Sequence, residues 1–193
     1  TLLFSATFAA ILIVFDRQVG FLKAVLVAPV SRTAIALGKI GSGAAQSAMQ
    51  AAILLLFAPV VGLRPAPEEL ALLIGAMLLA AVTFSALGVA VAARFTSTTV
   101  FPIVSNAVLL PLYFLSGALY PLAKAPVWMQ RLVYLDPVAY AVDLMRGTLI
   151  HHYFFAPWLS LSVLTGVIVV LTWLAVRVFQ RGEDTELGPV RFH

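Results

Sequence analysis

The stretch Asp16–Lys39, DRQVGFLKAVLVAPVSRTAIALGK, is a charged interruption between apolar parts of the chain. It holds one acid and the four basic residues Arg17, Lys23, Arg32 and Lys39. On a helix over 18–28 the apolar side chains share one face, Pro29 ends that helix, and Ser31 is a typical N-cap for the next one. The stretch predicts a short amphipathic helix at a membrane surface, which either anchors in lipid or docks on a soluble partner.

The composition of the whole chain indicates lipid as its main solvent. Hydrophobic residues make up 62% of the 193 residues, charged residues only 10%, and the mean hydropathy is +1.05. A soluble domain usually carries about 25% charged residues, and a water-soluble fold of this size cannot bury so much apolar surface. The chain has no cysteine, which excludes a disulfide framework and thiolate metal sites.

Long uncharged runs lie on both sides of the opening stretch. A bilayer core about 30 Å thick needs roughly 20 helical residues, and residues 1–15 would rise only roughly 22 Å, as part of a longer span. We expect one transmembrane domain over 1–180 and a cytoplasmic tail over 181–193. The spans are expected at about 1–15 (partial), 34–62, 69–94, 98–119 and 156–178. This is an all-α polytopic membrane fold with five visible spans of six.

The basic residues are unevenly divided between the two sides that these spans define. Eight lie on the side of Asp16–Lys39, Arg94 and the C-terminal tail, and four lie on the other side. The positive-inside rule places the richer side, with the C-terminus, in the cytoplasm. Thr1 then lies near the outer face, and we expect a further span before it. Topology also explains the pI near 9.8, so no nucleic-acid partner is expected.

The segment 121–147 is too short to cross a bilayer twice, yet it carries two helix starts. Pro126 suits a first helical position, and Asp136 before Pro137 pairs an N-cap residue with a proline in the first turn. We therefore expect two short helices in the outer leaflet, over 126–134 and 137–146. A plain amphipathic loop is the alternative.

Further residues of this segment also suggest roles. Trp128 fits an interfacial aromatic belt. Asp143 and Arg146 are spaced for an ion pair on one helix, which we interpret as structural rather than as a substrate contact. The candidate residues of the outer short helices are Pro121, Trp128, Asp136, Pro137, Asp143 and Arg146.

Residue types and motifs that the sequence lacks argue against several classes of protein. The inferred spans hold no charged residue inside them, whereas ion-coupled transporters generally carry an ionisable relay group. A phosphate-binding loop is absent, since Ile40 follows Gly38 and Lys39 where Ser or Thr is required. His151 and His152 are adjacent, so on a helix they point about 100° apart and do not grip one ion. We expect no catalytic, cofactor or metal site here; a membrane enzyme using the two histidines is a rival interpretation.

Polar and small residues within the spans have two open interpretations. Gln46 and Gln50 form a stripe on a span rich in small residues, which permit close helix packing in lipid. The two glutamines either line a conduit or form hydrogen bonds with a neighbouring helix. The same choice applies to Asn106 and to Gly117.

Two regions resemble one family of transporters. Phe15–Lys39 resembles the first cytoplasmic loop of type-2 ABC transporter permeases. Leu110–Gly147, LPLYFLSGALYPLAKAPVWMQRLVYLDPVAYAVDLMRG, resembles the family's other hallmark region, with its Leu-Ser-Gly break, Asp-Pro step and terminal Arg-Gly. The resemblance covers nearly the whole chain and is closest to the drug-efflux, daunorubicin-resistance-like branch.

The resemblance implies the permease subunit of an ATP-driven exporter in the cytoplasmic membrane of a bacterium or archaeon. The substrate would be a drug, lipid or glycan-like molecule, and the partners an ATP-binding subunit holding ATP and Mg, a second permease copy and membrane lipid. The coupling residues would be Arg17, Gly20, Phe21, Leu22, Lys23, Leu26, Pro29 and Arg32. Lys23 stands where many relatives carry an acid. The alternative is an ion-coupled or passive transporter without an ATPase partner.

Overall fold

The computed structural model describes most of the chain, namely residues 1–19, 31–63, 65–95, 97–120, 122 and 125–181. All regular structure in these residues is helical, and none of them forms a strand. The prediction of an all-α fold is therefore confirmed. The expected coupling helix over 18–28 lies mainly outside the described residues.

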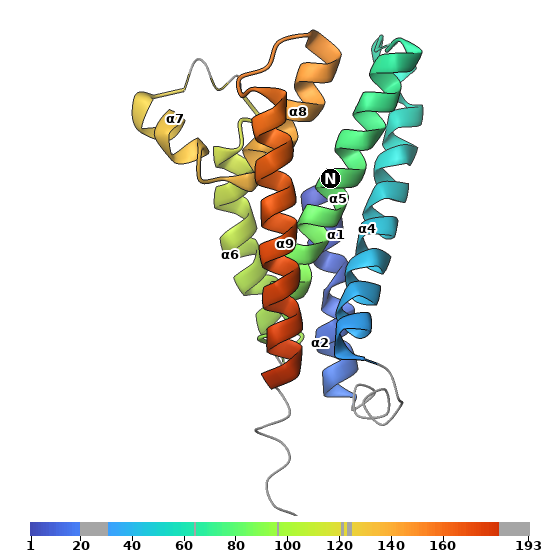
Figure 1. The fold of residues 1–193 in the computed structure, drawn as a ribbon, viewed down its shortest axis with the longest axis vertical. Helices are drawn as coiled ribbons and strands as arrows, with labels where there is room; N and C mark the ends of the chain where they lie inside the picture. The colour runs from blue at the N-terminus through green and yellow to red at the C-terminus, as the bar shows by residue number, and fades with distance from the viewer. Residues whose placement is uncertain (20–30, 64, 96, 121, 123–124, 182–193) are drawn as a thin grey trace, which may run out of the picture.

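The described helices follow one another along the chain as labelled in Figure 1. Their bounds are α1 Leu2–Ala9, α2 Ile11–Gln18, α4 Arg32–Leu56, the 3₁₀ turn η1 Ala58–Val61, α5 Pro67–Ala92, α6 Val100–Leu115, α7 Val127–Val133, α8 Pro137–Ile150 and α9 Pro157–Arg181. The helices α1 and α2 are nearly continuous and join at Ala10.

Three of these helices are long and apolar enough to cross a membrane, by length and composition. They cover Thr33–Val60, Pro67–Ala92 and Pro157–Val178. Two further apolar helices, Leu2–Asp16 and Val100–Leu115, are shorter. Five spans are expected from the sequence. The described residues hold three full-length candidates and two shorter apolar helices, so the number of spans stays a prediction.

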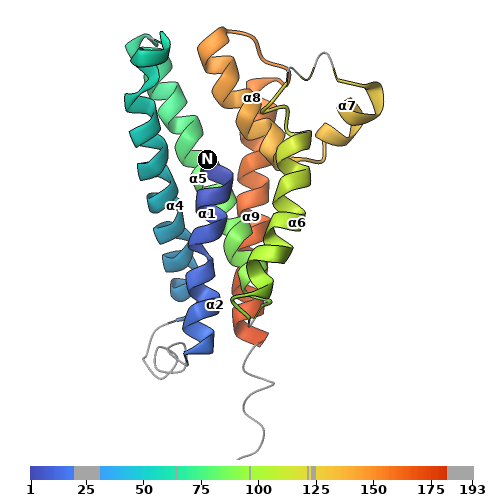
Figure 2. The ribbon, with the colours of Figure 1, turned by 180° about the vertical axis from the view of Figure 1, so that it is seen from behind.

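The bundle has two distinct ends (Figures 1 and 2). At the lower end of both views lie α2, the start of α4, the end of α5, the start of α6 and the end of α9. We call this the α2 end. At the opposite end, called the α8 end, α4 gives way to α5 and α8 gives way to α9. The α2 end thus collects the connections that the distribution of basic residues groups on one side.

Helix α5 occupies the middle of the bundle and packs against α1, α4, α8 and α9. Its contact with α1 is close because Gly88 has no side chain: a Cβ there would lie 2.8 Å from Thr7 Cα. Its contact with α4 includes a hydrogen bond from Ser85 Oγ to the Ile40 carbonyl at 2.8 Å. Small residues let helices approach closely in lipid, where dispersion and weak polar contacts hold them together.

Substitution of a single methyl group tests the α1–α5 contact. We expect Gly88→Ala to lower the midpoint of thermal unfolding in detergent, because the new methyl group overlaps the α1 backbone, and overpacking of this kind costs about 1–3 kcal/mol. Gly75→Ala is the matched control on the same helix, since nothing lies within 4 Å of its Cβ position. Equal stability of the two variants would contradict the close approach of α1 and α5.

Candidate functional site

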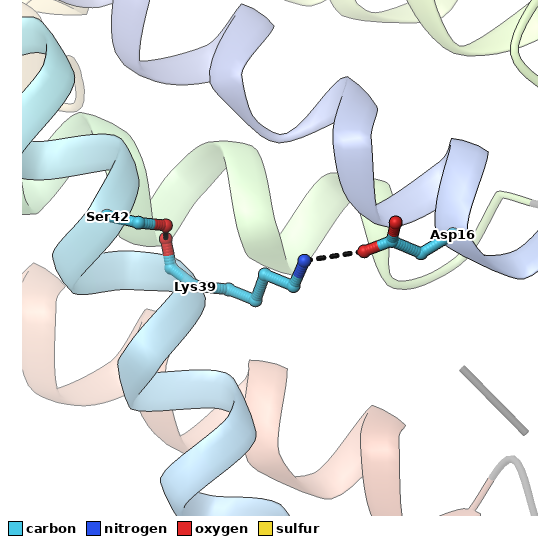
Figure 3. Close-up of polar contacts among 3 residues, drawn as sticks. All are labelled: Asp16, Lys39 and Ser42. Atoms are coloured by element: carbon cyan, nitrogen blue, oxygen red, sulfur yellow. Dashed lines mark hydrogen bonds and ion pairs between the residues drawn. The ribbon is translucent and has the colours of Figure 1, made fainter. Parts of the chain in front are cut away.

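The two ends of the opening stretch meet at the α2 end of the bundle. Lys39 reaches from the second turn of α4 toward α2, and its Nζ lies 2.6 Å from Asp16 Oδ2 (Figure 3). The side chains are 30% and 18% exposed, respectively. A charge-assisted bond of this length is among the stronger hydrogen bonds in proteins. The pair ties α2 to α4 on either side of residues 20–30.

A second contact ties α2 to the connection between α5 and α6. Thr98 Oγ1 donates to Gln18 Oε1 at 2.9 Å, where Gln18 is the last residue of α2. Ser31 is the N-cap of α4, and its Oγ accepts from the backbone N–H of Ala34 at 3.3 Å, as its sequence position predicts. Side chains at the α2 end therefore join α2 both to α4 and to the connection between α5 and α6.

The predicted coupling residues fall partly on described helices and partly outside the described residues. Gly20, Phe21, Leu22, Lys23, Leu26 and Pro29 are outside the described residues. Arg17 lies in α2 and Arg32 begins α4, and the structure describes the backbone but not the side chains of these two arginines. The coupling helix stays a prediction, whereas the two helices that flank it are in place.

At the α8 end, Asp136 and Pro137 begin α8. Asp136 is its N-cap, with Oδ1 accepting from the Val138 N–H at 2.8 Å, and Pro137 is the first helical residue. The helix continues to Ile150, beyond the expected end at 146, and α7 covers Val127–Val133. Trp128 on α7 is exposed, and Pro121 is outside the described residues.

Asp143 and Arg146 bind backbone groups rather than each other. Asp143 Oδ1 and Oδ2 accept from the N–H groups of Phe154 and Phe155, each at 2.9 Å. Arg146 donates from Nη2 to the carbonyls of Gly117 at 3.0 Å and Ala118 at 3.3 Å. We call these two side chains and their backbone partners the α8 clasp.

The expected ion pair between Asp143 and Arg146 is wrong, since the described salt bridges do not include it. The physical reason is that backbone groups beyond a helix end lack helical partners. The carbonyls after α6 and the N–H groups before α9 bind the two charges instead.

Gly117, a candidate for a conduit or for helix packing, forms a turn. It lies just after α6 with a φ of +73°, a conformation that side chains rarely adopt. A Cβ there would lie 2.5 Å from Leu122 Cγ. Its buried carbonyl is the one that Arg146 binds, so the residue serves the α8 clasp.

The other conduit candidates occupy different surroundings. Gln46 and Gln50 are exposed on α4, and neither bonds to a described residue. The buried residues of α4 include Ala36, Ile40, Gly43, Ala44, Ser47 and Ala51. Asn106 is half-buried on α6. Within the part of the chain that the structure describes, the side-chain amides of both glutamines are therefore available for a further contact.

The histidine pair has a carboxylate neighbour that its local sequence does not reveal. His151 Nε2 lies 3.0 Å from Glu69 Oε1, in the first turn of α5, while Glu69 Oε2 accepts from the Ala66 N–H at 2.8 Å. His151 has a φ of 53° and is 73% exposed at its side chain, and His152 is also exposed. Among the described residues no group of three or more His, Cys, Asp or Glu is placed to hold a metal ion. The contact ties α8 to α5.

These features define a polytopic helical membrane protein, with the Asp16–Lys39 pair at one end of the bundle and the α8 clasp at the other. Residues 1–150 match the model of the ABC-2 type transporter family. The chain therefore belongs to the ABC-2 type transporter family. Members of this family generally work with an ATP-binding subunit.

Two curated relatives illustrate the similarity. A putative transport permease, ycf38, of Pyropia yezoensis is 33% identical over 137 residues, which cover 68% of this chain and 46% of that protein. Nodulation protein J of Rhizobium leguminosarum bv. viciae is 28% identical over 181 residues, which cover 92% of this chain and 69% of that protein. The chain thus spans about half of the first relative and about two thirds of the second. Family and relatives support a membrane transport permease.

A charge swap tests the Asp16–Lys39 pair. Asp16→Lys and Lys39→Asp should each lower the stability of the protein in detergent, because each leaves two like charges facing each other. Loss of a hydrogen bond to a charged group costs about 1.5–3 kcal/mol. The double variant Asp16→Lys with Lys39→Asp should recover much of that loss, as measured in a double-mutant cycle of thermal unfolding. Strict additivity of the two single losses would show that the side chains do not interact.

Proposed function

We propose that this chain is the permease subunit of an ATP-driven exporter. Membership of the ABC-2 type transporter family supports the proposal most directly, because that family generally works with an ATP-binding subunit. The partner would bind ATP and Mg, and this chain would bind neither. The substrate would be a drug, lipid or glycan-like molecule moved outward across the cytoplasmic membrane.

The α2 end would face the cytoplasm and the ATP-binding subunit. It carries the connections rich in basic residues, which the positive-inside rule assigns to the cytoplasm. The helix expected over 18–28 would dock there on the partner through its apolar face. The C-terminus would lie on the same side, following α9.

The Asp16–Lys39 pair would transmit a movement of the coupling helix to α2 and α4 together. When ATP binding closes the soluble subunits, displacement of the coupling helix would reach α2 and α4 together, since the pair joins them at 2.6 Å. From α4 it would pass to α5 through the Ser85–Ile40 hydrogen bond. Such a movement does work only where the partner binds the two conformations with different affinity.

Substitutions in the coupling segment test this function. We expect Pro29→Ala, and the charge reversal Arg17→Glu with Lys23→Glu, to reduce transport and to uncouple it from ATP hydrolysis. Membrane insertion should stay intact, because these residues lie outside the expected spans. The measurement is substrate-stimulated ATPase activity and transport in proteoliposomes with the co-purified ATP-binding subunit. Arg131→Glu is the control, an exposed charge beyond the opposite end of α6.

The same transport and ATPase measurements also distinguish the ATP-driven exporter from an ion-coupled transporter. An ion-coupled transporter would move substrate without ATP and would stop when the ion gradient is dissipated. Unchanged substrate-stimulated ATPase activity in the coupling variants would contradict the proposed coupling helix.

A second copy of the chain would pack on the exposed face of α4. Gln46 and Gln50 lie on this face without a partner among the described residues. A polar side chain in lipid gains from a hydrogen bond across a helix interface. Two such subunits with two ATP-binding subunits would complete the exporter, with membrane lipid around them.

Cysteine cross-linking tests this interface, and the chain has no native cysteine to interfere. We expect Gln46→Cys to form a disulfide-linked dimer in oxidised membranes. Ser47→Cys is the matched control, because the neighbouring residue is 0% exposed and bonds within α4 to the carbonyls of Gly43 and Ala44. Cross-linking that is equal for the two variants, or absent from both, would argue against this face.

A further inference from the structure

The corner between α7 and α8 contains a buried carboxyl group with one oxygen unused. Asp136 is 0% exposed. Its Oδ1 accepts from the Val138 N–H, whereas its Oδ2 has no hydrogen-bond partner in the structure. Its apolar neighbours along the chain, Val133 and Val138, are buried as well. Capping α8 needs only one acceptor oxygen, so the second is not explained by the cap.

A charged carboxylate is costly in such a place. Burial of a charge without full hydrogen bonding is unfavourable, and the group takes up a proton instead. Burial accordingly raises the pKa of Asp136 to about 7, although hydrogen bonds from the backbone of Val138 and Ala139 act in the opposite direction.

In the part of the chain that the structure describes, two tyrosines are coupled to this carboxyl group. Tyr120 comes from the connection after α6 and Tyr140 from α8, while Tyr134, at the end of α7, is coupled to Tyr140. Burial, followed by the negative charge of Asp136, raises the pKa of Tyr120. Burial, followed by Tyr134 and Asp136, raises the pKa of Tyr140. Among the described residues no basic side chain forms a salt bridge with Asp136.

The corner is also connected to the α8 clasp. Tyr140 Oη donates to the Tyr134 carbonyl at 2.9 Å, across the Asp136 step. The Tyr140 ring stacks on Phe155 with centroids 4.3 Å apart. The backbone N–H of Phe155 is in turn bound by Asp143. Loosening of the corner would therefore reach the beginning of α9.

We propose that Asp136 is a proton-sensitive joint, whose neutral carboxyl group keeps the turn between α7 and α8 closed and whose ionisation draws water into the corner and loosens it. A carboxyl group with a raised pKa stabilises the folded form fully below its ordinary pKa, and this contribution is lost as the pH rises through the folded value. The corner is therefore well packed at acidic pH and becomes less well packed as the pH rises toward 8. This inference does not depend on the transport function or on an ATPase partner.

Hydrogen exchange of the whole chain in nanodiscs tests the joint. Protection factors of peptides covering 127–140, corrected for intrinsic exchange, should fall on the order of tenfold or more between pH 5.5 and pH 8. Asp136→Asn keeps an oxygen for the cap but cannot ionise, so its protection should be the same at both pH values. Asp143→Asn is the matched control, and it should keep the pH dependence. A flat wild-type profile, or a dependence that persists in Asp136→Asn, would overturn the proposal.

Infrared titration of the wild type gives a second measurement that needs no variant. The C=O band of a protonated carboxyl group should disappear as the pH rises through about 7, well above the ordinary range of aspartate. The loss of all protonated carboxyl bands below pH 5 would overturn the proposal even if Asp136→Asn failed to fold.

Discussion

Lipid offers no hydrogen bonds, so the backbone groups at helix ends must find their partners within the protein. This constraint accounts for the positions of several of the few charges in the chain. Asp143 binds the N–H groups before α9, Arg146 binds the carbonyls after α6, and Glu69 binds the N–H of the residue that caps α5. Each of these side chains lies at the α8 end, where the helices are broken most often. Charge in this part of the protein mainly completes the backbone, and the exposed contact between Glu69 and His151 is additional.

The sequence was sufficient for features governed by local physics. Long uncharged runs predict membrane helices because length and hydropathy alone determine whether a helix fits a bilayer. Ser31 and Asp136 are N-caps as expected, since a cap depends on residues within one turn of it. The family resemblance also rests on local motifs at the two ends of the bundle. None of these inferences needed the position of a distant residue.

The interactions that the sequence did not reveal all join distant elements. Asp16 and Lys39 are both in the opening stretch, yet only the return of α4 beside α2 brings them together. The contact between Gln18 and Thr98 spans far more of the chain. For Asp143 and Arg146 the i, i+3 spacing predicts a pair worth less than about 1 kcal/mol. Unpartnered backbone groups nearby form stronger contacts, and their positions follow from the fold.

Helix α6 shows how these distant contacts connect the two ends. It is only 16 residues long, and Pro111 within it removes one backbone hydrogen bond. Such a helix is weak on its own, but it is held at both ends by side chains of other elements. The hydrogen bond between Thr98 and Gln18 links its start to α2, and Arg146 links its end to α8. Side-chain contacts therefore run from α2 through the short helix α6 to the α8 clasp.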